Sequence, residues 1–345
     1  GAGTTASGAH QHGGIGVSAP SAVPTAAFAE VGVTTAGLWH SSFRAMASPI
    51  RVQLGGATTG PGLLQARVRA LFVEVERQCT RFDAASDLTR ANTAGDHWQE
   101  VGTHCYAALR AAADAHVTTG GRFDPRVLST LVDLGYGSSL AFADGDVRLA
   151  VEPCAPRVAP AAWRPGFDSA SRVRIGPDPV DLGGIGKGLT LRWTAELLRE
   201  AGCATFLVDA GGDCVFAGAG PDGSGWRIGV EDPAGGRDPV AVLQIDDGAC
   251  ATSSTRLRSW HAGGRPVHHL IDPSTGAPGG AGLAAVTVVD PDPATAEVWS
   301  KVLFLHGPDI AAAAKRHQIA ALWVRLDGTV GTSADIQSLL CWQRS

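Results

Sequence analysis

The sequence predicts an α+β fold. Strand-like segments with alternating apolar residues and helical segments with apolar residues three and four apart are mixed along the chain. They do not follow the regular strand–helix alternation of a doubly wound fold. Glycine-rich turns at 211–212, 218–225 and 235–236 separate several successive strand-like segments. With 345 residues, the chain is long enough to bury a full hydrophobic core.

The N-terminal part predicts a leader, one strand and three helices. Residues 1–38 are rich in Gly, Ala, Thr, Ser and Pro without a sustained period, so we expect a flexible leader there. Phe43–Leu54 is typical of a strand. An apolar stripe between Leu63 and Val75 predicts a helix ending near Cys79, and further helical patterns cover Thr103–Val117 and Pro125–Leu134.

The remainder of the chain predicts strands more often than helices. Residues 137–180 alternate short extended segments with proline-rich turns, and two helices are expected at 189–200 and Ala294–Leu305. The expected strands are Thr205–Val208, Trp226–Val230, Val240–Ile245, Leu283–Val289 and Ala320–Leu326.

Composition excludes several classes of function. The formal net charge is −5 and no basic run occurs, so nucleic-acid binding is not expected. No apolar run is long enough to span a membrane. The seven cysteines include no C-x-x-C pair, which favours small buried side chains in a reducing compartment. We therefore expect a cytoplasmic protein, or an extracytoplasmic one if a leader has been removed from a chain that begins with Gly.

The most informative motif is the glycine-rich loop 181–188, which reads Asp-Leu-Gly-Gly-Ile-Gly-Lys-Gly. It lies between an extended segment and the helix predicted at 189–200. A glycine-rich turn at a helix N-terminus offers unpaired N–H groups to an anion, so we expect a phosphate-bearing ligand. The glycine spacing fits neither the Walker pattern nor the dinucleotide-binding pattern.

Four other polar clusters are expected at turns. The first contains Ser86, Asp87 and Asn92, after Arg81-Phe82-Asp83, and the second is Thr119–Pro125. The third and fourth are Asp209–Asp213 with Gly229–Pro233 after it, and Ala251–Ser254 followed by His268–Gly276.

Taken together, these residues resemble the ApbE-type flavin transferases, which move FMN from FAD onto a Thr of a partner protein. The resemblance covers roughly residues 43 to 330, with the landmarks in the same order. Its motifs are Asp181–Gly188 for "D-x-x-G-x-x-K-G", Gly211–Asp213 for "G-G-[DE]", Thr119–Pro125 for "T-x-G-x-F-D-P" and His269–Gly276 for "H-x-x-D-P-x-T-G".

The resemblance implies a single T-fold-like domain over residues 39–345, of mostly antiparallel sheet with packed helices, and an FAD site. The implied catalytic residues are Asp181, Lys187, Glu297 and Lys301. The implied flavin-binding residues are Met46, Phe82, Arg122, Phe123, Asp124, Gly183, Gly184, Gly186, Gly188, Asp213, Thr252, His269 and Ile271. Of the adjacent histidines, at most one faces the flavin because neighbouring strand residues point to opposite faces, and the motif selects His269.

The resemblance also implies Mg²⁺, and here the sequence departs from the family. The family's "A-D-x-x-x-T" corresponds to residues 296–301, where Glu297 replaces the Asp and Lys301 replaces the Thr. The expected ligands are therefore the Gly186 carbonyl and Glu297, because a charged Lys301 cannot ligate a metal. Two readings stay open: Glu297 and Lys301 form an ordinary i,i+4 helix pair, or the Lys301 ammonium takes over part of the metal's charge stabilisation.

The family's "T-S-G-[DS]" is altered as well. It appears as Thr252-Ser253-Ser254-Thr255, so the glycine is lost, and Arg256 and Arg258 follow. We expect these arginines to be solvated surface residues, the more common situation, although they could bind phosphate or an acidic partner.

The predicted activity is FAD:protein FMN transfer, in which the FAD pyrophosphate is cleaved, FMN is attached to a Thr or Ser hydroxyl of an acceptor protein, and AMP is released. Alternatives are a flavin-binding protein without transfer activity, an FAD pyrophosphatase, or a transferase with a small-molecule acceptor and reduced Mg²⁺ dependence.

Overall fold

A computed structural model describes residues 32–33, 37–55, 60–142, 146–152, 154–158, 162–256 and 258–344. Its centre is a sheet of nine strands in the order β1-β2-β3-β8-β9-β12-β17-β18-β19, and every neighbouring pair is antiparallel. The strands are Gly32–Val33 (β1), Trp39–Ala45 (β2), Ser48–Gly55 (β3), Thr205–Ala210 (β8), Asp213–Ala217 (β9), Gly248–Ser254 (β12), Leu283–Asp290 (β17), Ala320–Arg325 (β18) and Val330–Thr332 (β19). The predicted α+β class and its antiparallel sheet are confirmed.

Seven α-helices are described. They are Pro61–Cys79 (α1), Asp87–Ala94 (α2), Thr103–Thr118 (α3), Leu128–Asp133 (α4), Gly186–Glu200 (α5), Pro293–Leu305 (α6) and Ile310–His317 (α7). Short 3₁₀ helices are Pro125–Val127 (η1), Gly307–Asp309 (η3) and Ala334–Leu339 (η4). The helices predicted to end near Cys79 and to cover 103–117, 189–200 and 294–305 are confirmed. None of the described helices combines the length and the apolar run that crossing a membrane requires.

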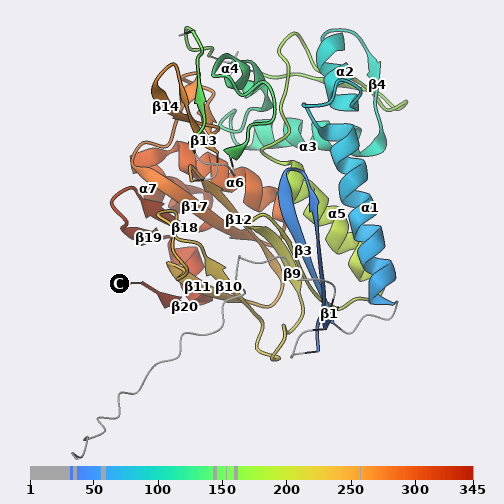
Figure 1. Cartoon of the computed structure of the whole chain (residues 1–345), viewed down its shortest axis with the longest axis vertical. Coiled ribbons are helices and arrows are strands. Elements are labelled where there is room, and N and C mark those ends of the chain that lie inside the picture. The colour runs from blue at the N-terminus through green and yellow to red at the C-terminus, as the bar shows by residue number, and fades with distance from the viewer. Residues whose placement is uncertain are drawn as a thin grey trace, which may run out of the picture.

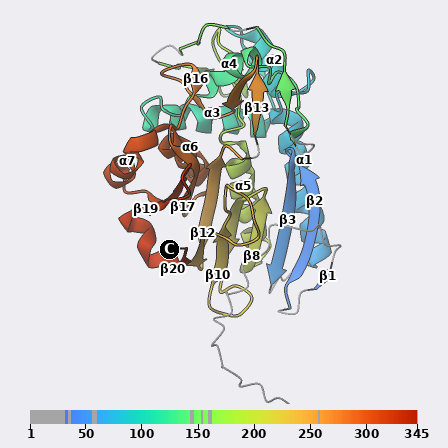
Figure 2. The same cartoon turned by 60° about the vertical axis from the view of Figure 1, so that its left-hand side comes forward.

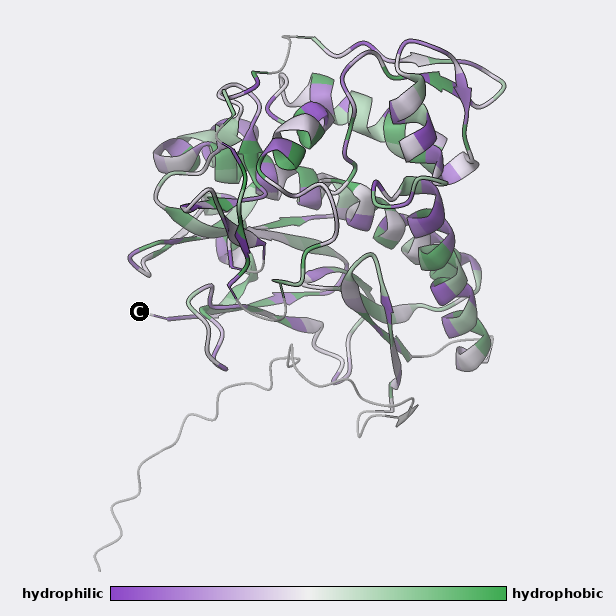
Figure 3. Cartoon of the chain, turned by 45° about the horizontal axis from the view of Figure 1, so that its top comes forward, coloured by the Kyte–Doolittle hydropathy of each residue, from purple (hydrophilic) through white to green (hydrophobic). Residues whose placement is uncertain are grey.

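Helices α1, α5, α6 and α7 cover one face of the main sheet. The core under α1 and α5 contains Leu64, Phe72, Leu198 and Phe206, all fully buried. In Figure 3, α1 carries alternating hydrophilic and hydrophobic bands, as expected for a helix with one buried and one exposed side. Helices α2, α3 and α4 gather at one end of the sheet (Figures 1 and 2), and this end carries the candidate site.

The other face of the main sheet is covered by a small sheet of Trp226–Val230 (β10), Ala241–Ile245 (β11) and Leu340–Gln343 (β20). The predicted strands at 226–230 and 240–245 are confirmed. The remaining short strands are Gln99–Glu100 (β4), Arg148–Leu149 (β5), Gly166–Phe167 (β6), Arg172–Arg174 (β7), Ser259–Ala262 (β13), Arg265–His268 (β14), Ile271–Asp272 (β15) and Ala277–Pro278 (β16).

Three expectations about local structure are wrong, and one helix was missed. The single strand expected at 43–54 is a hairpin, because Met46 and Ala47 adopt left-handed conformations with φ of 52° and 55° and turn the chain. The turn expected around Ser86 starts a helix, since the Ser86 side chain accepts a hydrogen bond from Thr89 N and caps α2. The turn expected at 251–254 belongs to β12, and α7 was not predicted at all.

The expected leader lies mostly outside the described residues. Within it, Gly32 and Val33 pair with β2, and Leu38 is buried in the core between the two sheets.

Candidate active site

A cleft is lined by the β2–β3 turn, the C-terminal end of α1, α4, the glycine loop before α5, and α6. Its empty volume, open mouth included, is about 1280 Å³, and cofactor-sized ligands occupy pockets of roughly 300–1,000 Å³. The wall includes most of the residues implied by the sequence: Met46, Phe82, Arg122, Phe123, Asp124, Asp181, Gly183, Gly184, Gly186, Lys187, His269, Ile271 and Lys301. Motifs separated by more than a hundred residues therefore meet in one place.

Four of the implied residues are absent from the described wall: Gly188, Asp213, Thr252 and Glu297. They lie behind it and hold its parts in place. Asp213 forms an ion pair with Lys187 and accepts a hydrogen bond from Thr252 N at 3.0 Å. Glu297 Oε2 accepts a hydrogen bond from Gly188 N at 2.7 Å, and this bond ties α6 to the first turn of α5.

Several N–H groups of the glycine loop donate hydrogen bonds within the protein. Gly183 N donates to Asp181 Oδ1 at 2.5 Å, and the N–H groups of Ile185 and Gly186 both donate to Leu182 O. Together with the Gly188–Glu297 bond, four N–H groups of the loop bind the protein's own oxygens. The expectation that they are free to bind an anion is wrong for these four, so the charge of a bound phosphate would need side-chain cations.

Two of the glycines lie in close contact with neighbouring groups, and at Gly188 the backbone of α6 leaves no room for a Cβ. A Cβ at Gly188 would lie 2.5 Å from Pro293 O and 2.6 Å from Ala294 Cα, both backbone atoms. A Cβ at Gly184 would lie 3.0 Å from Lys301 Cε and 3.0 Å from the Phe123 ring. The glycines therefore let α6 and the Lys301 stem lie directly on the loop.

The two lysines of the site differ in their partners. Lys187 is ion-paired with Asp213, whose side chain is 5% exposed. Lys301 forms no hydrogen bond or ion pair with the part of the chain described, and it contributes to the cleft wall. Burial lowers the pKa of Lys301, while Glu297 one turn away opposes that shift by favouring the charged ammonium. Burial raises the pKa of Glu297, and Lys301 opposes this in turn.

The residues present do not fit the Mg²⁺ site that the resemblance implies. The Gly186 carbonyl accepts a hydrogen bond from Thr190 Oγ1 at 2.7 Å, and one oxygen of Glu297 is used by Gly188. No group of three or more His, Cys, Asp or Glu side chains suited to a metal occurs among the described residues. A dication placed 4 Å from the Lys301 ammonium would be repelled by roughly 8 kcal/mol at an effective dielectric of 20.

One carboxylate oxygen of Glu297 nevertheless lacks a partner among the described residues and would be stabilised by a positive charge. Glu297 Oε1 is buried and has no hydrogen-bond partner within the described chain. A buried carboxylate oxygen without a partner is costly, so a nearby positive charge stabilises it. The charged group on the next turn of the same helix is the Lys301 ammonium.

His269 is placed on the cleft wall, whereas His268 packs against Phe304 with ring centroids 5.9 Å apart. His269 Nδ1 lies 3.3 Å from the Arg258 carbonyl oxygen, which can only accept, so Nδ1 carries the proton and Nε2 keeps its lone pair. Burial, followed by the positive charges of Arg258 and Lys301, lowers the pKa of His269 well below its ordinary value. The imidazole is therefore neutral at neutral pH.

The acidic residues of the Thr119–Pro125 motif and of the His269–Gly276 motif are engaged by arginines. Asp124 is buried in a bidentate pair with Arg126, with distances of 3.0 and 2.6 Å. Arg122 Nη1 lies 3.2 Å from Asp272 Oδ2 and links the two motifs across the cleft. These pairs fix the shape of the wall.

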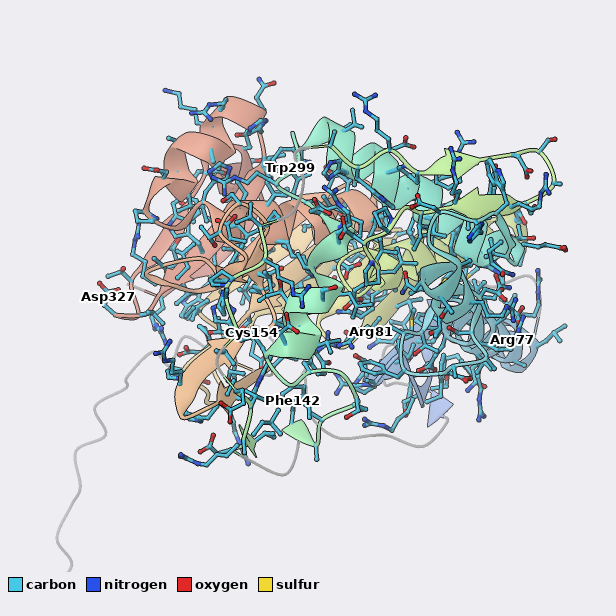
Figure 4. All side chains as sticks on the ribbon, turned by 90° about the horizontal axis from the view of Figure 1, so that it is seen from above. Arg77, Arg81, Phe142, Cys154, Trp299 and Asp327 are labelled. Atoms are coloured by element: carbon cyan, nitrogen blue, oxygen red, sulfur yellow. The ribbon has the colours of Figure 1, made fainter. Side chains whose placement is uncertain are left out.

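Arg81 was not singled out from the sequence, yet its guanidinium organises one end of the cleft. It lies 4.1 Å from the Phe82 ring centroid and 4.5 Å from that of Tyr136, it donates to Tyr136 O at 2.8 Å, and its Nε lies 3.1 Å from Asp181 Oδ2. Its side chain is 5% exposed and Nη2 is without a described partner. Figure 4 shows Arg81 within the molecule, whereas Arg77, from the preceding helix, lies at the edge.

Arg258 also lines the cleft, so the expectation that it is a solvated surface arginine is wrong. Arg256, two residues earlier, follows that expectation, since it pairs with Glu231 at a partly exposed position. Arg81, in contrast, lies alone between helix α1 and the capping Ser86. A single arginine in such a position belongs to no periodic pattern, so the sequence did not reveal its role.

Comparison with known proteins identifies the same family as the motifs. The model of the ApbE family matches residues 46–323. An FAD:protein FMN transferase of Klebsiella pneumoniae (strain 342) is 28% identical over 278 residues, which are 76% of each chain. One of Vibrio cholerae is 28% identical over 296 residues, covering 79% of this chain and 87% of the relative.

Solved structures share the fold. The ApbE protein of Thermotoga maritima superimposes with a TM-score of 0.77 at 24% identity, covering 89% of this chain and all of the other. The flavin transferase ApbE of Vibrio cholerae gives a TM-score of 0.70 at 24% identity, covering 87% of this chain and 98% of the other.

Proposed function

The chain belongs to the ApbE family, and we propose that it transfers the FMN part of FAD to an acceptor protein, the reaction for which its relatives are named, and that the accepting group is a hydroxyl. One observation carries the proposal: separated motifs meet in one cleft that presents basic and aromatic side chains together. A diphosphate needs the basic groups, and the two ring systems of FAD need flat apolar surfaces.

We place the FAD diphosphate against Lys301, Lys187 and the loop 183–187, because these residues bring two ammonium groups to one wall. Phe82 and Tyr136 lie elsewhere in the cleft, beside Arg81, with ring centroids 5.9 Å apart. Their rings offer a stacking surface to a planar ring system.

The transfer is a displacement at phosphorus. The acceptor hydroxyl oxygen forms a bond to the phosphorus of the FMN half, the bond from that phosphorus to the bridging oxygen breaks, and AMP leaves with that oxygen. Such a reaction depends mainly on positioning and on neutralising the diphosphate charge. The hydroxyl proton passes to a base, and we propose His269 Nε2 because its imidazole is neutral and its tautomer is fixed.

Mg²⁺ bound to FAD would neutralise the diphosphate, but Gly186 and Glu297 do not complete a ligand set in this structure. We therefore derive no step through a metal.

The test is incubation of the protein with FAD and a Thr-containing FMN-acceptor protein. The expected result is an acceptor whose mass rises by one FMN less one water, with one AMP released per transfer. Release of FMN and AMP without an acceptor would instead identify an FAD pyrophosphatase, and FAD retained uncleaved would identify a flavin-binding protein. Modification of a small hydroxyl compound but of no protein would identify a small-molecule acceptor.

A matched pair of variants links the activity to the cleft. Lys187→Met removes an ammonium group from the proposed diphosphate wall and leaves Asp213 without its partner, so the transfer rate is expected to fall at least tenfold. Lys315→Met removes one from the exposed end of α7 and is expected to leave the rate unchanged. Equal rates for both variants would contradict the placement of FAD.

The compartment is a proposal as well. We place the protein in a reducing compartment, the cytoplasm, since all seven cysteines are unpaired and five of them are buried. Cys214 and Cys250 face each other across neighbouring strands with sulfurs 3.2 Å apart, so an oxidising compartment would favour a bond between them. Thiol mass mapping of the protein from its native cells tests this.

A further inference from the structure

We propose that the Lys301 ammonium is a built-in cation that takes the place of a divalent metal at the FAD diphosphate, so that this protein binds and cleaves FAD without Mg²⁺. The inference rests on the proposed function, because it concerns the same diphosphate. It follows from a disagreement between the family's metal site and the residues present at 297 and 301.

The first step is geometric. Lys301 lies one helical turn after Glu297 on α6, and its stem crosses directly over Gly184, where even a Cβ would come within 3.0 Å of Lys301 Cε. The loop therefore leaves space for this side chain. Lys301 lines the cleft, and its ammonium has no hydrogen bond or ion pair within the described chain, so it is available to a ligand.

The second step concerns what else could hold the diphosphate. Four N–H groups of the loop are bonded internally, and Lys187 is committed to Asp213. Lys301 and Arg258 are the cleft-lining cations that no described residue neutralises by an ion pair, and of the two Lys301 lies directly on the glycine loop. A preorganised charge of this kind stabilises a developing negative charge without having to be recruited from solution.

The third step concerns Glu297. Its Oε2 holds Gly188 N, and its buried Oε1 has no partner. Glu297 places a carboxyl group one helical turn before Lys301, and its negative charge favours a cationic neighbour. The role expected of Glu297 thereby changes from binding a metal to maintaining the charge of a lysine and fixing the loop.

The experiment measures FAD binding and FMN transfer in EDTA and in Mg²⁺. Binding is followed by quenching of flavin fluorescence, which needs no turnover. For the unmodified protein we expect the same Kd, within threefold, in both conditions, and a transfer rate that survives EDTA. A Kd more than tenfold weaker in EDTA, or transfer lost in EDTA and restored by Mg²⁺, would overturn the inference.

Three variants separate charge from shape. Lys301→Met keeps the stem without the charge, and its Kd for FAD in EDTA is expected to weaken at least tenfold. Lys301→Arg keeps the charge and is expected to retain binding within a few-fold. Lys301→Thr restores an oxygen ligand beside Glu297 and is expected to gain Mg²⁺ dependence. Unchanged FAD binding in Lys301→Met contradicts the proposal.

Two controls distinguish the loss of charge at the cleft from a general loss of charge and from misfolding. Lys315→Met loses an equal charge far from the cleft and should bind FAD like the unmodified protein, and thermal melts of each variant verify folding. If FAD binds tightly in EDTA but no acceptor is modified, the proposed transfer fails while the role of Lys301 stands. If transfer occurs only with Mg²⁺, the proposed function stands and the role of Lys301 fails.

Discussion

Two regions face each other across the glycine loop, and each contributes one lysine. On the first turn of α5, Lys187 is paired with Asp213, which also holds Thr252 N. On α6, Lys301 lacks an ion pair within the described residues, and its neighbour Glu297 keeps one oxygen unsatisfied. The same residue type therefore serves two purposes: Lys187 is neutralised by an ion pair, whereas Lys301 is left available to bind a ligand.

The difference shows how a site can be both stable and reactive. A buried ion pair that loses one partner costs several kcal/mol, so the Lys187–Asp213 pair resists change. An unpaired, partly buried ammonium gains more from a bound anion than from water. We infer that the α5 region fixes the geometry of the site, while the α6 region supplies the charge that meets the ligand.

Breaking the fixed pair gives the largest expected effect. Asp213→Ala leaves the Lys187 ammonium without its partner and Thr252 N without its acceptor. The free energy of unfolding is expected to fall by about 3 kcal/mol, measured by urea denaturation. Glu231→Ala, which breaks the partly exposed pair with Arg256, should cost less than about 1 kcal/mol. Equal losses would mean that the Lys187 pair is no better shielded than a surface pair.

The second prediction sharpens the comparison through pH. The pKa of His269 is lowered by burial, then by Arg258, then by Lys301, with a smaller contribution from His268. Because the base must be neutral, activity of the unmodified protein should not decline as the pH falls through about 6.5, the ordinary His value. Removing the positive charge of Lys301 raises the pKa of His269. As the pH is lowered, Lys301→Met should therefore lose activity at a higher pH than the unmodified protein does.

The measurement is the pH dependence of single-turnover transfer at saturating FAD, so that weaker binding does not enter. Lys315→Met, with its charge removed from the exposed end of α7, should show the profile of the unmodified protein. If the decline of activity at low pH occurs at the same pH in Lys301→Met, then either Lys301 does not influence the pKa of His269 or His269 is not the base that accepts the proton.

Much of the fold could be predicted because its helices carry long apolar stripes. The helix ending at Cys79 and the one over 294–305 each expose a repeating pattern that short elements lack. Helix α2 depends instead on one capping bond from Ser86, and the hairpin at Met46 on two left-handed residues that are neither Gly nor Asn. A serine followed by Asp87 is compatible with a helix cap but also with a turn, and the hairpin at Met46 lacks the Gly or Asn residues that usually mark one.

The site followed from motif order, but its internal bonding did not. The motifs placed Lys187, His269 and Lys301 together, and the structure brings them to one cleft. The sequence could not predict that the loop N–H groups donate to Asp181, Leu182 and Glu297. Each acceptor lies on a neighbouring turn or a distant helix. Partnering is a property of three-dimensional contact, and here it moved the anion-binding role from backbone to side chain.

The smallest expected effect lies at the hairpin that carries Met46 to the cleft. Ala47 is exposed with φ of 55°, a left-handed conformation that costs a residue with a Cβ roughly 1–2 kcal/mol. Ala47→Gly relieves this strain but gives the unfolded chain more freedom, so the free energy of unfolding should rise by about 0.5 kcal/mol. Ala84→Gly, at an exposed turn position without a positive φ, should lower it by a similar amount. Paired urea titrations decide this, and a loss of stability in both variants would show that the hairpin tip is not strained.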